Sequence, residues 1–202
     1  MSTARARVFS GIRAALDPLP TLAPRPTVPH GVADALWLAG EPDPVALFVK
    51  RAQAVGTVCF ANLEECRHWL LDQSARKIHL SPGLAELQGR LTEVGEVVLE
   101  YSRELVDEID VAITPAAAGI AESGTIVLTD ESTPDRLAAL APWIHIAVLP
   151  REAIHRSIAD AIAALPDDPN VIWVTGPSKT ADVEGILIQG VHGPGIQGCL
   201  LV

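Results

Sequence analysis

Glu122 is the one carboxylate in the segment 118–125, whose other residues are small, apolar or hydroxyl-bearing. A carboxylate in such surroundings lies either at an exposed loop tip or beside a ligand or a positive charge. Gly124 lets another part of the chain approach the backbone closely, and Thr125 closes the segment. Taken alone, the segment is better explained as a tight turn between two elements than as a site.

The segment 174–182 has the composition of an anion-binding loop. A strand is expected to end before Gly176, and a helix is expected from 180 to about 187. Free N–H groups at the start of a helix attract anions, and Ser178, Lys179 and Thr180 would add side-chain donors. The segment is not a P-loop, because no glycine directly precedes the lysine. We therefore predict that these residues and Gly176 contact a ligand.

Helix capping is the alternative explanation for the same segment. Ser178 would then be the N-cap, and Asp182 and Glu184 would stabilise the first helical turn. This explanation does not account for Lys179, because a cation is unfavourable near the positive end of a helix.

The segment 190–194, Gly-Val-His-Gly-Pro, supplies His192 as a ligand contact or a general base. A lone histidine is more often structural, so both interpretations stay open. The overlapping residues 193–198 match the pattern GxGxxG. We do not expect NAD binding there, because the four residues that follow leave no room for a helix or for an acidic residue about 20 positions on.

Short apolar runs alternate with amphipathic segments along most of the chain. Helices are expected at 3–16, 44–54, 62–73, 150–165 and 180–187. Strands are expected at 57–60, 77–80, 96–99, 110–114, 125–129, 143–149, 171–175 and 198–202. This order predicts an α/β fold of the Rossmann-like type, a mostly parallel sheet with helices on both faces. Ligands in such folds bind at the carboxyl ends of strands, which directs attention to the loops before Thr125 and after Thr175.

The N-terminal residues 1–30 are expected to form an arm, and residues 31–202 one domain. Five prolines between positions 17 and 29 exclude a helix or a central strand there. The helix before them carries an apolar stripe. The arm is either a free tail or a segment that packs on a partner or on a second copy of the chain.

Composition limits the partners and cofactors. The formal net charge of -10 argues against nucleic acid or an anionic membrane as the main partner, but it allows one local anion-binding loop. Three cysteines without a CxxC pair predict neither a disulfide framework nor an iron–sulfur or zinc site made by this chain alone. The first residues lack the apolar core of a secretory signal, and no stretch approaches the ~20 apolar residues of a membrane span, so we expect a cytoplasmic protein.

Three strings resemble the signature blocks of the lactate-utilization protein C family, the LUD domain. They are GIAESGTIVL at 119–128, TGPSKTADVEG at 175–185 and GVHGP at 190–194. The resemblance covers roughly residues 107–202. Ser123 stands where threonine is common in the family, and Lys179 where arginine is common. The lysine keeps the charge but loses bidentate geometry toward a carboxylate or a phosphate.

The resemblance implies a fold like that of the sugar-phosphate isomerase, CoA-transferase and formyltetrahydrofolate cyclo-ligase group. It also implies a component of a system that oxidises L-lactate to pyruvate, in which partner proteins carry the iron–sulfur clusters and this chain carries no cofactor. In that role Ser178, Lys179 and Thr180 would hold a small anion, with Glu122, Asp182, Glu184 and His192 lining the rest of the site. The rival hypothesis is a free-standing enzyme in which Glu122 is a base or a nucleophile, and a third is a scaffold without a ligand.

Overall fold

The computed structural model describes residues 3–17, 42–165, 168, 170–181 and 185–202. The chain divides into two compact units, Met1–Val32 and Ala33–Val202. The first unit contains α1 (Thr3–Leu16), which confirms the helix expected at this position. All its side chains are exposed, including the apolar stripe of Val8, Phe9, Ile12 and Leu16.

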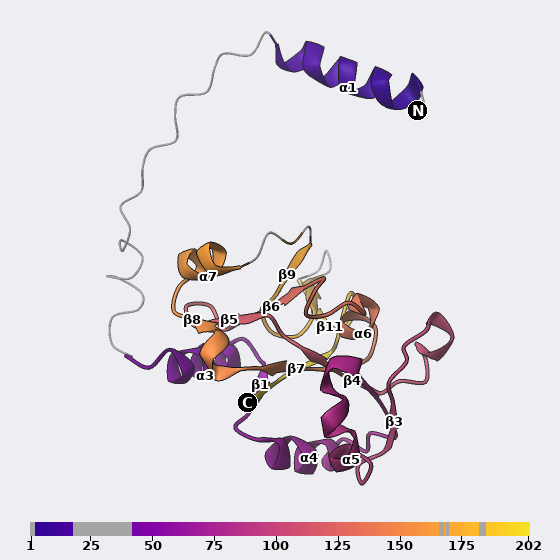
Figure 1. Ribbon diagram of the computed structural model, residues 1–202, viewed down its shortest axis with the longest axis vertical. Helices are drawn as coiled ribbons and strands as arrows, with labels where there is room; N and C mark the ends of the chain where they lie inside the picture. The colour runs from indigo at the N-terminus through magenta and orange to yellow at the C-terminus, as the bar shows by residue number, and fades with distance from the viewer. Residues whose placement is uncertain (1–2, 18–41, 166–167, 169, 182–184) are drawn as a thin grey trace. The chain divides into compact units, whose positions relative to one another are not determined.

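The second unit is built on a six-stranded parallel sheet with the order β1-β12-β7-β4-β2-β3 (Figure 1). The strands are β1 (Val58–Phe60), β2 (Lys77–Leu80), β3 (Glu96–Val98), β4 (Val111–Pro115), β7 (Ile144–Leu149) and β12 (Ile196–Leu201). Every pair in this sheet is parallel. The predicted α/β class with a mostly parallel sheet is therefore confirmed.

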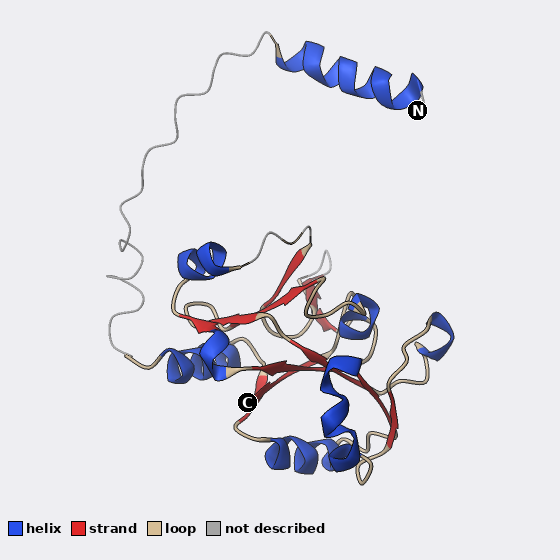
Figure 2. Ribbon diagram, viewed as in Figure 1, coloured by secondary structure: helices blue, strands red, loops and turns tan. Residues whose placement is uncertain are grey.

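Helices and a second sheet cover the two faces of the parallel sheet. One face packs against α4 (Leu63–Asp72) and α5 (Gln88–Leu91) through a cluster of leucine, isoleucine and valine side chains. The other face packs against α3 (Pro44–Ala54), α6 (Arg136–Leu140) and a second sheet. Figure 2 shows this layering, with the second sheet and α4 on opposite sides of the parallel sheet.

The second sheet has four strands in the order β8-β5-β6-β9. They are β5 (Ala118–Ile120), β6 (Thr125–Thr129), β8 (Ile154–His155) and β9 (Val171–Val174). β5 and β6 form an antiparallel hairpin, and β9 pairs antiparallel with β6. The loops before Thr125 and after Thr175 therefore belong to this second sheet and not to the carboxyl edge of the parallel one.

Two predicted helices are wrong. The region 150–165 contains η3 (Arg151–Ala153), then β8, and only then α7 (Ile158–Ala164), because Ser157 and Asp160 form a capping box that starts a new helix there. The region 180–187 holds no helix in its described part. β10 (Lys179–Ala181) instead pairs antiparallel with β11 (Leu187–Gln189), so the apolar run 186–188 enters a hairpin.

The local signals for the first domain helices are confirmed. Asp43 caps α3 by accepting a hydrogen bond from the Val45 nitrogen, with Pro44 at the first helical position. Asn62 caps α4 in the same way through the Glu65 nitrogen. Two further short helices are η1 (Pro82–Leu87) and η2 (Arg103–Leu105). Within the described ranges, no helix is long and apolar enough to cross a membrane.

Candidate anion-binding site

The C-terminal turn of α3 is the place where two of the three glycine-containing segments meet. Gly124 has φ +69°, and a Cβ atom there would lie 2.3 Å from the Ala52 nitrogen. Gly176 has φ +75°, and a Cβ atom there would lie 2.4 Å from the Val55 carbonyl oxygen. Both turns therefore need glycine for their backbone angle and for their close contact with the end of this helix.

Lys179 also lies at this helix end. Its Nζ donates to the Val55 carbonyl oxygen at 3.5 Å, and a Cβ atom at Gly56 would lie 3.5 Å from the same Nζ. The lysine is exposed and stands in β10, not at the start of a helix. The predicted helix N-terminus is therefore replaced by a helix C-terminus, where a cation is favourable and the lysine is explained by the helix it approaches.

A chain of three hydroxyl groups connects the two glycine turns. Ser123 Oγ lies 2.6 Å from Thr125 Oγ1, and Thr125 Oγ1 lies 2.8 Å from Thr175 Oγ1. Thr125 is buried, whereas Thr175 is exposed. Two hydrogen bonds among three hydroxyls leave one hydroxyl proton for an outside acceptor, so this chain can donate to an anion.

Ser178 holds the third glycine segment in place. Its backbone N–H donates to the Pro194 carbonyl at 2.9 Å, and its carbonyl accepts from the Gly190 nitrogen at 2.9 Å. Its Oγ accepts a hydrogen bond from the backbone N–H of His192 at 3.3 Å. The His192 side chain is exposed. The structure therefore brings 190–194 to the 176–179 turn, with Ser178 as the residue that links them.

The Glu122 carboxylate is engaged in a hydrogen bond within the protein. Its Oε2 accepts from the Ile158 nitrogen at 2.9 Å, which satisfies a free N–H group in the first turn of α7. Its backbone N–H donates to the Arg156 carbonyl at 3.1 Å. These contacts explain a half-buried carboxylate in an apolar stretch without a ligand.

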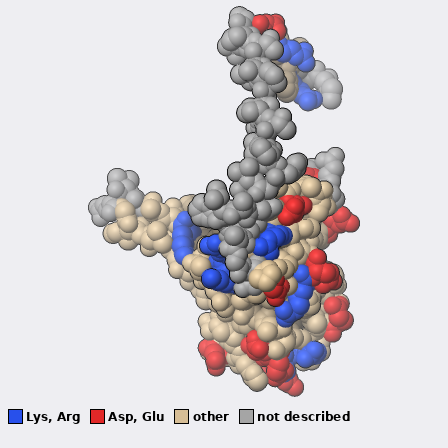
Figure 3. Space-filling view, turned by 90° about the vertical axis from the view of Figure 1, so that its left-hand side faces the viewer, with Lys and Arg blue, Asp and Glu red and all other residues tan. Residues whose placement is uncertain are grey.

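Two arginines that the sequence did not single out lie near the two ends of α3. Arg51 stands in the last turn of α3, where its carbonyl carbon would lie 2.5 Å from a Cβ atom at Gly124. Arg156 follows β8, and its guanidinium donates to the Pro42 carbonyl. Figure 3, seen from the side where α3, β8 and α7 lie, shows Lys and Arg side chains grouped near the middle of this face. Arg51 therefore belongs to the C-terminal end of α3, and the Arg156 guanidinium lies at its N-terminal end.

The remaining predicted site residues divide into two groups. Thr180 is half-buried in β10 opposite Ile188, so it belongs to the hairpin. Asp182 and Glu184 lie outside the described residues. In the part of the chain that the structure describes, no group of three His, Cys, Asp or Glu residues is placed to hold a metal ion.

Comparisons with known proteins show which family this chain belongs to. Residues 45–202 match the LUD domain. "Lactate utilization protein C" of an Exiguobacterium species is 34% identical over 163 residues, which is 69% of this chain and 71% of that protein. The proteins of the same name from Oceanobacillus iheyensis and Bacillus subtilis are 36% and 33% identical over 98 and 107 residues. These two matches span 45% and 47% of this chain but only 42% and 43% of those proteins.

The fold is shared with a solved structure. The crystal structure of a DUF162 family protein from Deinococcus radiodurans aligns with a TM-score of 0.60 and 21% identity. The alignment covers 79% of this chain and 96% of that one. At this identity the likeness supports the fold alone.

Proposed function

The chain belongs to the LUD domain family, and on that premise we propose that it is a non-redox component of lactate utilization that binds a small carboxylate anion. The name of the relatives, "Lactate utilization protein C", supports a role in lactate utilization. The site proposed for the anion is the loop cluster, defined as the turns 122–125, 175–179 and 190–193 around the C-terminal turn of α3.

The single observation that carries this proposal is local positive charge on an acidic chain. The net charge is -10, yet Lys179 reaches the C-terminal end of α3 beside the glycine turns, and Arg51 belongs to the last turn of that helix. The hydroxyl chain of Ser123, Thr125 and Thr175 has one hydroxyl proton that its internal hydrogen bonds do not use. Cations and hydroxyl donors at one place are the groups that a carboxylate needs.

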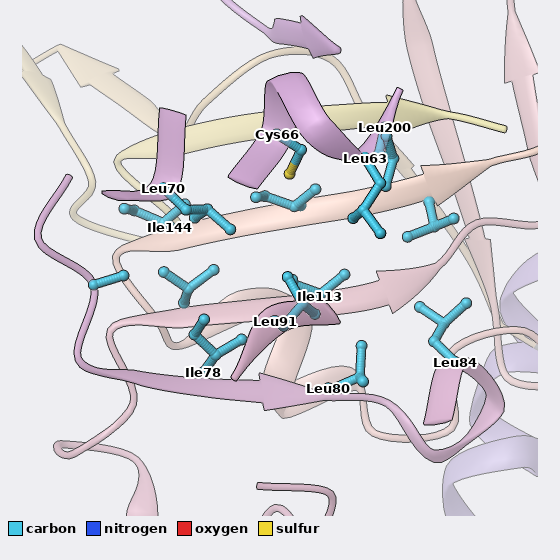
Figure 4. Packing of buried hydrophobic residues seen from close by; sticks show 14 of the residues in the cluster. Leu63, Cys66, Leu70, Ile78, Leu80, Leu84, Leu91, Ile113, Ile144 and Leu200 are labelled. Carbon is cyan, nitrogen blue, oxygen red and sulfur yellow. The ribbon is translucent and has the colours of Figure 1, made fainter. Parts of the chain in front are cut away.

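The proposal assigns iron–sulfur clusters to partner proteins. Burial raises the pKa of the Cys59 thiol to about 11 and that of Cys66 to about 12. Burial also raises the pKa of the Cys199 thiol, the residue that pairs with Cys59 across β1 and β12. Cys66 packs in the core cluster on one face of the parallel sheet (Figure 4) and Cys59 and Cys199 in the cluster on the other face, whereas an iron–sulfur cluster usually takes four cysteines at one place.

The hairpin β10–β11 is the surface we assign to an iron–sulfur partner. Ile186, Leu187, Ile188 and Val191 are 42% to 63% exposed, and Trp143 beside them is 54% exposed. The Trp143 ring lies against Gly190, where a Cβ atom would be 2.3 Å from the ring. Consecutive exposed apolar side chains around an exposed tryptophan are typical of a surface that a protein partner covers.

The rival hypothesis of a free-standing enzyme has less support. A nucleophilic glutamate needs a carboxylate that faces a substrate, and one oxygen of Glu122 is bound to the first turn of α7.

The test of anion binding is a thermal shift panel with L-lactate, pyruvate, a CoA ester and a sugar phosphate. A ligand at 100 times its Kd stabilises the folded state by about 2.7 kcal/mol. We expect a carboxylate to give a shift that is lost in Lys179→Ala and kept in Arg76→Gln, which removes an exposed cation elsewhere. A shift that survives in Lys179→Ala would refute the loop cluster as the site.

A further inference from the structure

The helix α1 has an apolar face that no described residue covers. This face is a stripe of four large side chains at the spacing of one helical side, namely Val8, Phe9, Ile12 and Leu16. Their side chains are 46% to 61% exposed, and no residue of α1 is buried. An uncovered stripe of large apolar side chains is typical of a helix that binds to another surface.

The charge of α1 is opposite to that of the rest of the chain. The helix carries Arg5, Arg7 and Arg13 and no acidic residue. Residues 17–202 carry all 25 acidic residues and only the other 12 of the 15 basic ones. The net charge of -10 therefore does not describe this helix, and the surface that α1 binds should be anionic.

The three arginines are available to such a surface. Their side chains are exposed, and in the described ranges none of them takes part in an ion pair. The guanidinium carbon of Arg5 lies 5.4 Å from the centroid of the Phe9 ring. This cation therefore lies against the stripe and keeps its charged end in water, as an arginine at the border of an apolar surface does.

The distribution of the cations favours a lipid interface over a groove in an acidic protein. At about 100° per residue, Arg13 lies beside the stripe, Arg5 at its N-terminal end and Arg7 on the opposite face of the helix. A protein groove that covers the stripe would leave Arg7 outside it. In a helix that lies in a lipid interface, the same arginine points into the headgroup layer, and the other two reach the phosphates along its sides.

We propose that α1 binds an anionic lipid surface. The helix lies in the plane of the interface, with Phe9, Ile12 and Leu16 at the hydrocarbon boundary and the three arginines among the headgroup phosphates. The stripe has only four large side chains, so binding requires both the apolar contact and the charge. This proposal does not depend on the loop cluster or on the function proposed for it.

The test is co-sedimentation of the full chain with lipid vesicles. One set contains phosphatidylcholine and phosphatidylglycerol in equal parts, and the other contains phosphatidylcholine alone. We expect at least tenfold tighter binding to the anionic vesicles. High salt should remove this preference, since the screening length falls from about 10 Å at 0.1 M to about 3 Å at 1 M. Absence of binding to the anionic vesicles, or equal binding to both sets, would overturn the proposal.

Two double variants assign the binding to α1. Phe9→Ser with Ile12→Ser removes the centre of the stripe, and Arg7→Gln with Arg13→Gln removes two of the three cations. Each should weaken binding to the anionic vesicles at least tenfold. The thermal unfolding of the domain should stay unchanged in both, because no side chain of α1 is buried. Wild-type vesicle binding by either double variant would refute the assignment.

Matched controls and a soluble polyanion complete the experiment. Leu71→Ser removes an exposed leucine from α4, and Arg103→Gln removes an exposed arginine of η2, so both should keep the wild-type affinity for vesicles. Poly-L-glutamate at the concentration of the anionic lipid should not displace the chain, because it offers charge without hydrocarbon. Displacement by poly-L-glutamate would show that α1 recognises acidic polypeptides, and the lipid assignment would be wrong.

Discussion

Acidification should destabilise the domain through a single buried histidine, His145 in β7. This side chain is fully buried. Its Nδ1 lies 3.0 Å from Gln197 Oε1, and its Nε2 lies 2.9 Å from Thr114 Oγ1. Burial lowers the pKa of His145 to about 4, although the Gln197 hydrogen bond acts in the opposite direction. Near neutral pH, the folded protein therefore contains His145 in its neutral form.

The sign and size of the effect follow from the two pKa values. The unfolded chain takes up a proton on this histidine near pH 6.5, and the folded chain only near pH 4. Between these values the unfolded state binds more protons, so stability falls as the pH falls. At about 1.4 kcal/mol per pKa unit, the loss is about 3 kcal/mol once the pH is below both values.

Urea unfolding at about pH 7 and about pH 4.5 measures this loss, with His145→Gln as the non-titrating control. Carboxylates and His79, whose pKa burial also lowers, titrate in both proteins and cancel in the difference. We expect the wild type to lose about 2–3 kcal/mol more than the variant over this interval. Equal losses in the two proteins would refute the buried neutral histidine.

Further predictions concern the turns and the surface. Gly124→Ala should destabilise the protein by more than about 3 kcal/mol, since it adds a clash with the backbone of α3 to an unfavourable φ. Gly185→Ala, with φ +77° and no atom of the described residues within 4 Å of the added Cβ, should cost only about 1–2 kcal/mol in thermal unfolding; similar losses in the two variants would contradict the close packing at Gly124. Ser157→Ala should lose about 1 kcal/mol by removing the cap of α7, and a loss below about 0.3 kcal/mol by the same assay would contradict that role. If the proposed iron–sulfur partner binds the β10–β11 hairpin, Leu187→Ser should abolish its co-purification, whereas Leu71→Ser, equally a loss of one exposed leucine, should not; co-purification retained by Leu187→Ser would exclude the hairpin as the interface.

The sequence predicts those parts of the fold that depend on neighbours in the chain. The caps Asp43 and Asn62 each start a helix, because the groups that they satisfy lie two or three residues away. The helix expected at 150–165 begins only at Ile158, because Ser157 is an equally local signal that starts a helix in the middle of this range. Hairpin pairing with residues 187–189 outweighs the helical pattern after Lys179, and such pairing is not visible in a local window.

The candidate site, too, can be predicted from the sequence only where neighbouring residues define it. The sequence identifies the three glycine segments, and the structure brings them together at the end of α3. It does not identify Arg51, since an arginine in a last helical turn is a common surface feature.

The most direct test of the loop cluster is a titration of the isotope-labelled chain with pyruvate, followed by amide chemical shifts in a two-dimensional NMR spectrum. The account predicts saturable shifts at residues 123–125, 175–179 and 190–193, and their loss in Lys179→Ala. Saturable shifts confined to other parts of the chain, or none, would contradict the assignment of these loops as the anion site.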